Sequence, residues 1–440
     1  MLIVNADIAG RKCAVRFHET IEAVGQLQPS DGEAVYDAQG GRLLPGLHDH
    51  HIHLRAMAAR RASLDLSKAD IGAVQDLAEE IDGTGWIRVF GYHNDRHGEL
   101  NRDVLDELCP ARPIRVQHSS GKMWVLNSQA IAILGVTAKS HAGVEVEHGR
   151  VTGRLFRMDD WLGQRQRNET VDLESLMEEL LRLGITSVTD TSFNNDRAAE
   201  AQLKNLKGPN GQPFEVHCMG DESLVGGGQL KVMLDEDRLP EREILRRKVV
   251  AAHMADRGVA FHCVSRIEML IAMDCLKATG LHDADRIEHG AMIGAEMIPE
   301  LASLGVPVVT QPGFLRDRGE RFRREVSPSE FGDLYRYQSL LQAGICVVCS
   351  SDAPYGPVNP EVCVQAAATR LSDEEQPINV VEAVTAETAR LSYLLDPSLG
   401  RMRRIEVGAV ANLCLLSDGS PTQQAPLEVW LAGDAIVRPA

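Results

Sequence analysis

The amino-acid sequence predicts an α/β fold in which eight parallel strands close into a TIM (β/α)8 barrel. Short apolar β-rich runs alternate with amphipathic helical stretches through the centre of the chain, and eight such runs can be placed. This alternation is typical of a parallel sheet covered by helices. The length of 440 residues accommodates one barrel of about 250 residues together with additional segments.

The predicted strands are short, and helical patterns lie between most of them. The strands cover residues 43–53, 185–190, 214–219, 230–235, 259–262, 286–289, 306–311 and 345–352. The clearest helical patterns cover residues 241–257, 296–304 and 329–343. Catalytic groups of such a barrel lie at the C-terminal ends of the strands, so the strand ends are where a functional site is expected.

Two regions fall outside the barrel pattern. Residues 54–184 separate the first two strands, a far longer connection than a βα unit needs, and we predict an insertion at about 83–160. Residues 1–44 and 402–440 contain short strands and turns. We expect both ends to pair into one small β-sandwich domain, which leaves residues 45–401 for the barrel and its insertion.

Composition excludes some classes of function. The chain has 63 acidic and 46 basic residues, a net charge of −17, which argues against broad nucleic-acid binding. It has no apolar run of about 20 residues, as a membrane-spanning helix would need. Its apolar N-terminal stretch is shorter than that of a signal peptide, because polar residues begin at Asn5. We therefore expect a cytoplasmic protein that binds neither nucleic acid nor membrane.

Nine cysteines occur without a disulfide-like framework, which fits a reducing compartment. Cys346 and Cys349 have the spacing of a redox motif, but they lie in an apolar run that is typical of a buried strand. Residues i and i+3 of a strand point to opposite faces, so we expect a structural role for the pair.

Histidines, a lysine and an aspartate mark the predicted strand ends. His51 and His53 follow one another at i and i+2, so their imidazoles project to one face and can bind one divalent cation. Further candidates end later strands: Lys231 on the fourth, His262 on the fifth, His289 on the sixth and Asp352 on the eighth. Neutral imidazoles and a carboxylate suit zinc and similar metals. Asp352 beside such a metal is positioned to take a proton from bound water.

Each candidate also has an ordinary structural interpretation. The four histidines could be solvent-capped or packed in a core, and Asp352 could cap the following helix. Lys231 could pair with Asp235, and an unmodified ammonium cannot bind a cation. The complete set, in order along the strands, favours metal binding.

The motifs around these residues resemble those of the amidohydrolase superfamily, metal-dependent hydrolases built on a TIM barrel. The similar segments are 45–53, 286–290 and 350–352. Segments 86–93, 118–128 and 183–188 resemble the branch called amidohydrolase family 3 or YtcJ-like, which includes N-substituted formamide deformylases. The resemblance covers essentially the whole chain.

The resemblance implies a role for each candidate. His51 and His53 would bind a buried metal, His262 and His289 a more exposed one, and a Lys231 carboxylated by CO2 would bridge the two. Asp352 would be both a ligand and the general base that works with a metal-bound hydroxide. The expected metals are two zinc ions, with manganese or iron as alternatives. The expected substrate is a small amide, N-formyl or N-acyl amine or cyclic amide, and a homodimer is expected only by analogy.

Some positions depart from the family pattern. The fifth strand continues with Cys263-Val-Ser265-Arg266 instead of Gly-Asp, and Lys122 follows Gly121 where the family has histidine. These changes bear on the substrate more than on the chemistry. Lys122, His93 in the insertion and Gln311 at the end of the seventh strand are the candidate substrate-binding residues, whereas His48 and His50 should point away from the metals.

Two other functions stay open from the sequence. One is a deaminase on the same barrel, which usually holds one metal and lacks the lysine on the fourth strand, so Lys231 argues against it. The other is an inactive relative that serves as a scaffold. Such proteins lose metal ligands, whereas here all six positions are filled.

Overall fold

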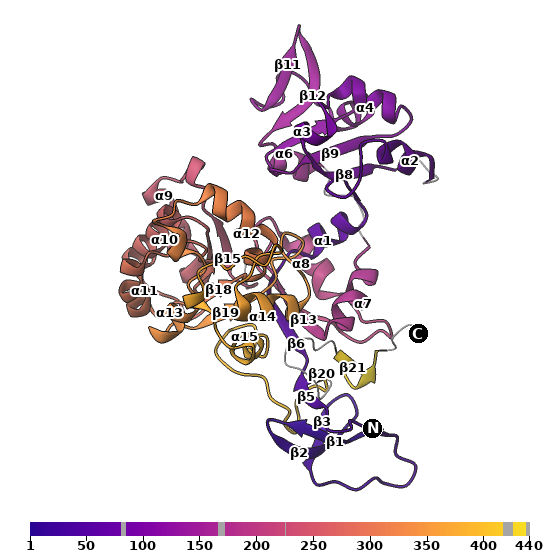
Figure 1. Ribbon diagram of the computed structural model, residues 1–440, viewed down its shortest axis with the longest axis vertical. Coiled ribbons are helices and arrows are strands. Elements are labelled where there is room, and N and C mark those ends of the chain that lie inside the picture. The colour runs from indigo at the N-terminus through magenta and orange to yellow at the C-terminus, as the bar shows by residue number, and fades with distance from the viewer. Residues whose placement is uncertain (81–84, 166–171, 225, 417–425, 437–440) are drawn as a thin grey trace. The chain divides into compact units, whose positions relative to one another are not determined.

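The computed structural model describes residues 1–80, 85–165, 172–224, 226–416 and 426–436 (Figure 1). The chain forms two compact units, one of Met1–Leu54 with Leu173–Ala440 and the other of Arg55–Asp172. Residue 83, the predicted start of the insertion, lies outside the described residues, as do residues 437–440 of the segment expected to join the β-sandwich. Among the helices of these residues, none combines the length and the apolar character that a membrane span needs.

Strands from both ends of the chain pair in one sheet. The strands are β1 (Leu2–Ile8), β2 (Arg11–Phe17), β3 (Ile21–Gly25), β4 (Val35–Asp37), β5 (Arg42–Pro45), β20 (Leu413–Leu416), β21 (Pro426–Leu431) and β22 (Asp434–Ala435). Their order is β22-β21-β20-β5-β1-β2-β3, with β4 paired to β1. The two ends meet where β5 and β20 run antiparallel, with Leu43 opposite Leu415.

This sheet encloses its own core. Trp430 on β21 and Phe17 on β2 lie with ring centroids 6.1 Å apart, although β20, β5 and β1 stand between their strands in the sheet order. Tyr36 on β4 also packs edge-on against Trp430. The predicted β-sandwich is therefore a single sheet that curves back over one cluster of buried side chains. Its extent as a separate domain stays a prediction.

The same unit contains eight further strands that pair in parallel. They are β6 (Leu47–Ile52), β13 (Ile185–Asp190), β14 (Glu215–Cys218), β15 (Leu230–Met233), β16 (Val259–Cys263), β17 (Arg286–His289), β18 (Val308–Thr310) and β19 (Val347–Cys349). They form a three-stranded sheet, β14-β13-β6, and a five-stranded sheet, β15-β16-β17-β18-β19. Every residue of β6, β13 and β17 is buried, as is typical of parallel strands covered by other elements on both faces.

Single parallel bridges connect the edges of these two sheets. Gly220, beyond β14, bridges to Leu230 on β15, and Ile52 on β6 bridges to Ala353, beyond β19. The predicted first strand is divided at Gly46 into β5, in the end sheet, and β6. A Cβ at Gly46 would lie 2.1 Å from Thr186 Oγ1, so a larger residue would require the Thr186 side chain to move.

Helices follow most of these strands, and Figure 1 shows α9, α10, α11 and α13 around the outside of the strands. The longer ones are α7 (Glu174–Arg182), α8 (Arg197–Lys204), α9 (Arg242–Met254), α10 (Arg266–Thr279), α12 (Gly313–Glu325) and α14 (Pro360–Thr369). The shorter ones are α11 (Ile298–Leu304), α13 (Tyr337–Gln342), α15 (Ala386–Ser392) and the 3-10 helices Glu236–Arg238, Ala295–Met297, Phe331–Asp333 and Val380–Glu382. The predicted 329–343 helix is thus divided into a 3-10 turn and α13.

The Arg55–Asp172 unit has a six-stranded sheet of its own, in the order β11-β12-β10-β9-β8-β7. The strands are β7 (Leu64–Asp65), β8 (Ile87–Tyr92), β9 (Ile114–His118), β10 (Met123–Leu126), β11 (Val144–Glu147) and β12 (Arg150–Phe156). The helices are α1 (Leu54–Arg61), α2 (Ala73–Glu80), α3 (Asn94–His97), α4 (Arg102–Leu108), α5 (Ser128–Leu134) and α6 (Asp159–Arg165). The unit starts well before the predicted 83–160 insertion, because Leu66 and Val74 already belong to its core.

The nine cysteines all carry free thiols. Cys349 on β19 is buried and Cys346, just before that strand, is exposed. Burial raises the pKa of the Cys349 thiol to about 12, which makes it a poor nucleophile at neutral pH. Cys349 thus lies in a buried strand as the pattern predicts, whereas Cys346 lies outside the strand and is exposed.

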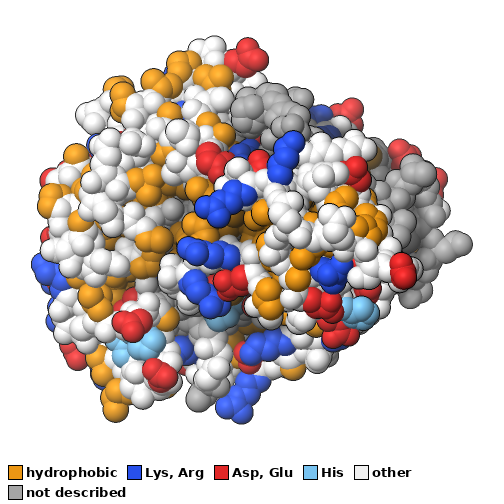
Figure 2. Space-filling view, turned by 90° about the horizontal axis from the view of Figure 1, so that it is seen from below, with side chains coloured by type: hydrophobic (Ala, Val, Ile, Leu, Met, Phe, Trp, Pro, Cys, Tyr) orange, Lys and Arg blue, Asp and Glu red, His pale blue; other side chains and the backbone are white. Residues whose placement is uncertain are grey.

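The surface mixes apolar and charged side chains. On the face that Figure 2 shows, hydrophobic side chains lie among lysines, arginines and acidic residues. Single exposed apolar side chains, such as those of Met254 and Val381, are ordinary on a globular protein.

Candidate metal centre

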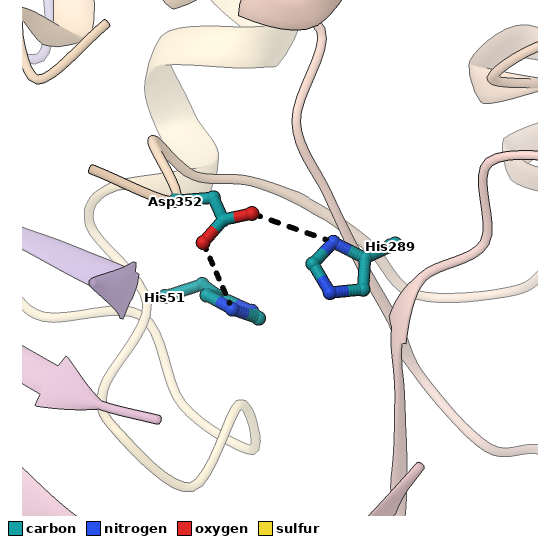
Figure 3. Close-up of side chains that lie close together, drawn as sticks. All are labelled: His51, His289 and Asp352. Carbon is teal, nitrogen blue, oxygen red and sulfur yellow. Dashed lines mark ion pairs between the residues drawn. The ribbon is translucent and has the colours of Figure 1, made fainter. Parts of the chain in front are cut away.

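Four histidines and one aspartate gather at the C-terminal ends of the parallel strands. His51 lies on β6 and His53 follows it, His262 lies on β16, His289 ends β17, and Asp352 follows β19. Potential ligand atoms of His51, His289 and Asp352 all lie within 4.8 Å of one another. Figure 3 shows the Asp352 carboxylate facing both imidazoles.

The Asp352 carboxylate is the centre of the cluster. Its Oδ1 lies 3.1 Å from His53 Nε2 and 3.4 Å from His51 Nε2. Its Oδ2 lies 3.8 Å from His289 Nδ1. The His262 ring packs edge-on against that of His289, with centroids 4.4 Å apart. The structure therefore brings together five of the six residues for which the sequence predicts metal binding.

The sixth residue, Lys231, lies on β15 next to the strand that carries His262. Its side chain is buried, and its nearest charged groups include Glu288 and Asp352. Burial lowers the pKa of its ammonium, although the two carboxylates act in the opposite direction. Lys231 thus shares the buried electrostatic environment of the histidine and aspartate cluster.

Backbone hydrogen bonds hold the first and last strand ends together. The Asp352 N–H donates to the His51 carbonyl at 2.8 Å, and the His53 N–H donates to the Ala353 carbonyl at 2.8 Å. The buried Asp49 carboxylate accepts from the His51 N–H at 3.2 Å. These bonds explain why residues about 300 positions apart in the sequence present their side chains to one point.

Two members of the cluster have left-handed backbones. His289 has a φ of 69° and Asp352 a φ of 54°. Such a conformation costs a residue with a Cβ about 1–3 kcal/mol and concentrates at functional sites. Regular strand alternation would place the neighbours Glu288 and His289 on opposite faces. The turn at His289 instead lets its ring join the cluster that Glu288 also contacts.

Three buried polar atoms of the cluster have no hydrogen-bond partner among the described residues. They are His51 Nε2, Lys231 Nζ and Asp352 Oδ1. Leaving such an atom unsatisfied costs about 1–3 kcal/mol, so native proteins rarely do so without a reason. Imidazole nitrogen and carboxylate oxygen are the donors that first-row divalent metals prefer. The residues present therefore fit a metal ion.

Burial favours the neutral form of three of the imidazoles, those of His51, His262 and His289. Burial lowers the pKa of His51 and of His289 well below the usual range. Burial also lowers the pKa of His262 to about 3, with a further contribution from Lys231. Neutral rings keep a lone pair for a cation, so no proton has to leave before the metal binds at neutral pH.

Each of three rings is fixed through its Nδ1 atom, which leaves Nε2 available. The contacts are His51 Nδ1 with Glu288 Oε2 at 2.5 Å, His53 Nδ1 with Ser192 Oγ at 3.1 Å and His289 Nδ1 with Gln311 Oε1 at 2.8 Å. Such partners set the tautomer and the orientation of metal-binding histidines. Neither Glu288 nor Ser192 is among the site residues predicted from the sequence. Glu288 could have been noticed as a charged residue inside a buried strand, whereas nothing in the sequence marks Ser192.

Gln311, a candidate substrate-binding residue, is completely buried. Its Oε1 faces His289, and its amide nitrogen donates to the Ser350 hydroxyl at 3.0 Å. These contacts tie Gln311 to the orientation of a cluster histidine, and a role in substrate binding stays a prediction.

The other two candidates for substrate binding lie in the Arg55–Asp172 unit. His93 caps α3, and its Nδ1 accepts from the Asp95 N–H at 3.3 Å. Lys122 is exposed on the turn between β9 and β10. Substrate contact by either residue stays a prediction.

His48 and His50 have their own hydrogen bonds inside the first unit. His48 contacts the Ser187 and Thr189 hydroxyls with its two ring nitrogens, at 2.9 and 2.8 Å. His50 Nε2 lies 3.2 Å from the Ser392 carbonyl oxygen. Both ring nitrogens of His48 are therefore occupied, which agrees with a structural role.

The unusual residues after the fifth strand have local partners. The Ser265 side chain caps α10 and forms a capping box with Glu268. Arg266 donates to Asp333 at 2.6 Å. This departure from the family pattern thus starts a helix and anchors a loop.

The chain was compared with protein-family models and with curated proteins. The model of the amidohydrolase family matches residues 34–437. The N-substituted formamide deformylase of Arthrobacter pascens is 26% identical, over 96% of this chain and 91% of that protein. YtcJ of Bacillus subtilis (strain 168) is 22% identical, over 77% of this chain and 75% of that protein. These matches confirm the predicted resemblance to the YtcJ-like branch.

Solved structures show the same fold. An uncharacterized metal-dependent hydrolase from Pyrococcus horikoshii OT3 is similar with a TM-score of 0.79 at 20% identity, covering 96% of this chain and 98% of that chain. An uncharacterized metal-dependent hydrolase from Pyrococcus furiosus is similar with a TM-score of 0.76 at 19% identity, covering 96% of this chain and 99% of that chain. The fold is thus the α/β fold of these hydrolases. The family match over residues 34–437 shows that the chain belongs to the amidohydrolase family and is a hydrolase acting on carbon–nitrogen bonds other than peptide bonds.

Proposed function

We propose that this amidohydrolase uses two divalent metal ions, preferably zinc, to hydrolyse the carbon–nitrogen bond of a small amide-type molecule. The observation that carries the proposal is the convergence of His51, His289 and Asp352 at the strand ends, where His51 Nε2 and Asp352 Oδ1 are buried without a hydrogen-bond partner among the described residues. The residues proposed to hold the metals are His51, His53, Lys231, His262, His289 and Asp352.

The eight parallel strands are proposed to form a closed TIM barrel. Support comes from the two parallel bridges, Gly220 to Leu230 and Ile52 to Ala353, which lie at the edges where the two sheets would have to join. A closed barrel collects the ends of all its strands around one opening. That arrangement accounts for ligands that come from the first, fourth, fifth, sixth and eighth strands.

Asp352 is proposed as the general base. When bound, the metal acidifies a water molecule and polarises the carbonyl group of the substrate. The Asp352 carboxylate lies 3.1 to 3.4 Å from the Nε2 atoms of His53 and His51, which would hold the metal, so it would be close enough to serve as the proton acceptor. It can accept the water proton and later deliver it to the leaving nitrogen.

Lys231 is proposed to bridge the metals after its amine is carboxylated by CO2. Only a neutral amine reacts with CO2, and burial of Lys231 lowers the pKa of the ammonium. Its Nζ atom has no hydrogen-bond partner among the described residues, so no hydrogen bond has to break before the amine reacts with CO2.

The substrate is proposed to be an N-formyl or N-acyl amine. The Arthrobacter pascens relative is named for deformylation of N-substituted formamides, and it matches nearly the full length of both chains. The Arg55–Asp172 unit, which carries His93 and Lys122, is where we expect residues that select the substrate.

Metal content tests the proposal directly. Purified protein loaded with zinc or manganese should hold about two equivalents of metal and hydrolyse members of a panel of N-formyl amines, N-acyl amines, hydantoins and lactones. A single equivalent with activity on amino-substituted rings would favour a deaminase instead. Protein with neither bound metal nor activity across the panel would contradict the proposal.

The variant Lys231→Ala tests the bridge. It should lose bound metal, and short carboxylic acids should restore part of the metal and of the activity. The matched control is Lys277→Ala, which removes an exposed lysine that pairs with Glu300 on the surface. If Lys231→Ala retains both metals, the bridge lies elsewhere.

A further inference from the structure

A chain of three buried side chains runs from the sixth strand to the first. Arg286 Nε donates to Glu288 Oε1 at 2.5 Å, and Glu288 Oε2 lies 2.5 Å from His51 Nδ1. All three residues are at most 1% exposed. Charged side chains are almost never buried this deeply unless they are paired, so the arrangement serves a purpose that an apolar core would not.

Arg286 contacts His51 from two directions. Through Glu288 it reaches the imidazole ring, and through its Nη2 atom it donates to the carbonyl of the preceding residue, His50, at 2.8 Å. One guanidinium of the sixth strand therefore fixes both the ring and the backbone of a residue of the first strand. The guanidinium has only donors, so Glu288 Oε1 and the His50 carbonyl both accept from it.

The chemistry of these groups determines where the His51 proton lies. Glu288 Oε1 accepts from Arg286, and its Oε2 is left to accept from His51, so the hydrogen of this contact is assigned to Nδ1. The lone pair of the neutral ring is then on Nε2, which lies 3.4 Å from Asp352 Oδ1 and has no hydrogen bond of its own.

We propose that Arg286 and Glu288 are positioning residues that set the tautomer and orientation of His51, so that its Nε2 lone pair points at the metal. This inference rests on the proposed function for the metal. Neither residue touches the proposed reacting atoms: Glu288 acts through His51, and Arg286 acts through Glu288 and the His50 carbonyl.

The first test needs no metal. Selective ¹⁵N labelling of histidine, with His51→Gln to assign the signal, reports which ring nitrogen carries the proton in the metal-free protein. The expected result is a proton on Nδ1. A proton on Nε2 in metal-free protein that still binds two metals would overturn the inference and leave the proposed function standing.

The second test measures metal affinity by competition with a chelator. Glu288→Ala should weaken metal binding about 10–100-fold, as the loss of such partners does in other metalloproteins. Glu288→Gln should lose less, because the amide oxygen can accept the same hydrogen bond from Nδ1. Cobalt-loaded Glu288→Gln should also keep the visible absorption bands of the wild type, and those of Glu288→Ala should shift.

Controls separate positioning from folding and from the proposed function. Glu300→Gln removes an exposed carboxylate and should leave metal affinity unchanged. Circular dichroism establishes that each variant is folded, and Glu288→Gln serves if Glu288→Ala does not fold. Wild-type affinity in folded Glu288→Ala would overturn the inference. A wild type that binds no metal, yet carries the His51 proton on Nδ1, would count against the proposed function and still support the positioning of the ring.

Discussion

The substitution Asp352→Asn separates the metal-binding and proton-transfer roles of one side chain. Asparagine has nearly the same shape, so its oxygen can occupy the position 3.1 to 3.4 Å from the Nε2 atoms of His53 and His51. It has no negative charge and does not accept a proton from water. The side chain is 8% exposed, so bulk solvent has little access to replace it as a base.

Loss of a general base typically costs about 10²–10⁴ in rate. This corresponds to about 2.7–5.4 kcal/mol of transition-state stabilisation. With four histidines and Lys231 unchanged, metal content should stay close to that of the wild type. The assay is the initial rate of the zinc-loaded variant on the best N-formyl or N-acyl amine, with metal measured on the same sample.

A matched control is Asp256→Asn, because the Asp256 side chain is fully exposed and its Oδ1 lies 3.3 Å from His282 Nε2, in a surface ion pair. This variant should keep wild-type rate and metal content. If Asp352→Asn contains full metal and loses less than about tenfold in rate, Asp352 is not the base.

Three further predictions concern stability. Gly46→Ala places a Cβ 2.1 Å from Thr186 Oγ1 and should lower the free energy of unfolding by about 1–3 kcal/mol. Urea unfolding measures this change. An unchanged midpoint of the urea transition would show that the structure accommodates the Cβ without cost. Burial lowers the pKa of His217 to about 4 from 6.5, so the unfolded chain binds a proton between these values that the folded chain does not. The stability from this group is complete above pH 6.5 and falls by about 2 kcal/mol from pH 7 to pH 5 in metal-free protein. If the free energy of unfolding of His217→Gln depends on pH as strongly as that of the wild type, the loss of stability does not come from His217. A metal supplied at about 100 times its dissociation constant should raise the free energy of unfolding by about 2.7 kcal/mol, and a melting temperature that a chelator does not lower would argue against binding to the folded state.

The sequence predicts the buried strands well where local composition is decisive. The bounds of β13 agree with the prediction, because Ile185, Thr186, Val188 and Thr189 are β-branched and the strand is buried on both faces. The bounds of β17 also agree, although only Ile287 is apolar there, because the whole segment is buried. The first strand is divided at Gly46, because one half pairs with β20 and the other with β13. That division depends on partners more than a hundred residues away, which no local pattern contains.

The candidate site shows the same limit. The histidines and Asp352 are identifiable because each ends a strand. The partners of their rings are not, because Glu288 and Ser192 reach His51 and His53 only through the pairing of distant strands. The Arg55–Asp172 unit begins earlier than the predicted insertion for a similar reason. The local sequence around Leu66 does not indicate that it belongs to this unit, because Leu66 packs in a core with residues of β8 and β9.

The hydrogen bonds between Asp352 and His51 also have a consequence for biosynthesis. During translation, about 300 further residues are synthesised after His51 before Asp352, its partner at the candidate site, is made. Contacts so distant in sequence form late and slow the folding of the chain. Until then the His51 and His53 rings lack Asp352 and Lys231. Under the proposed function, the complete set of metal ligands therefore exists only once these segments have been synthesised.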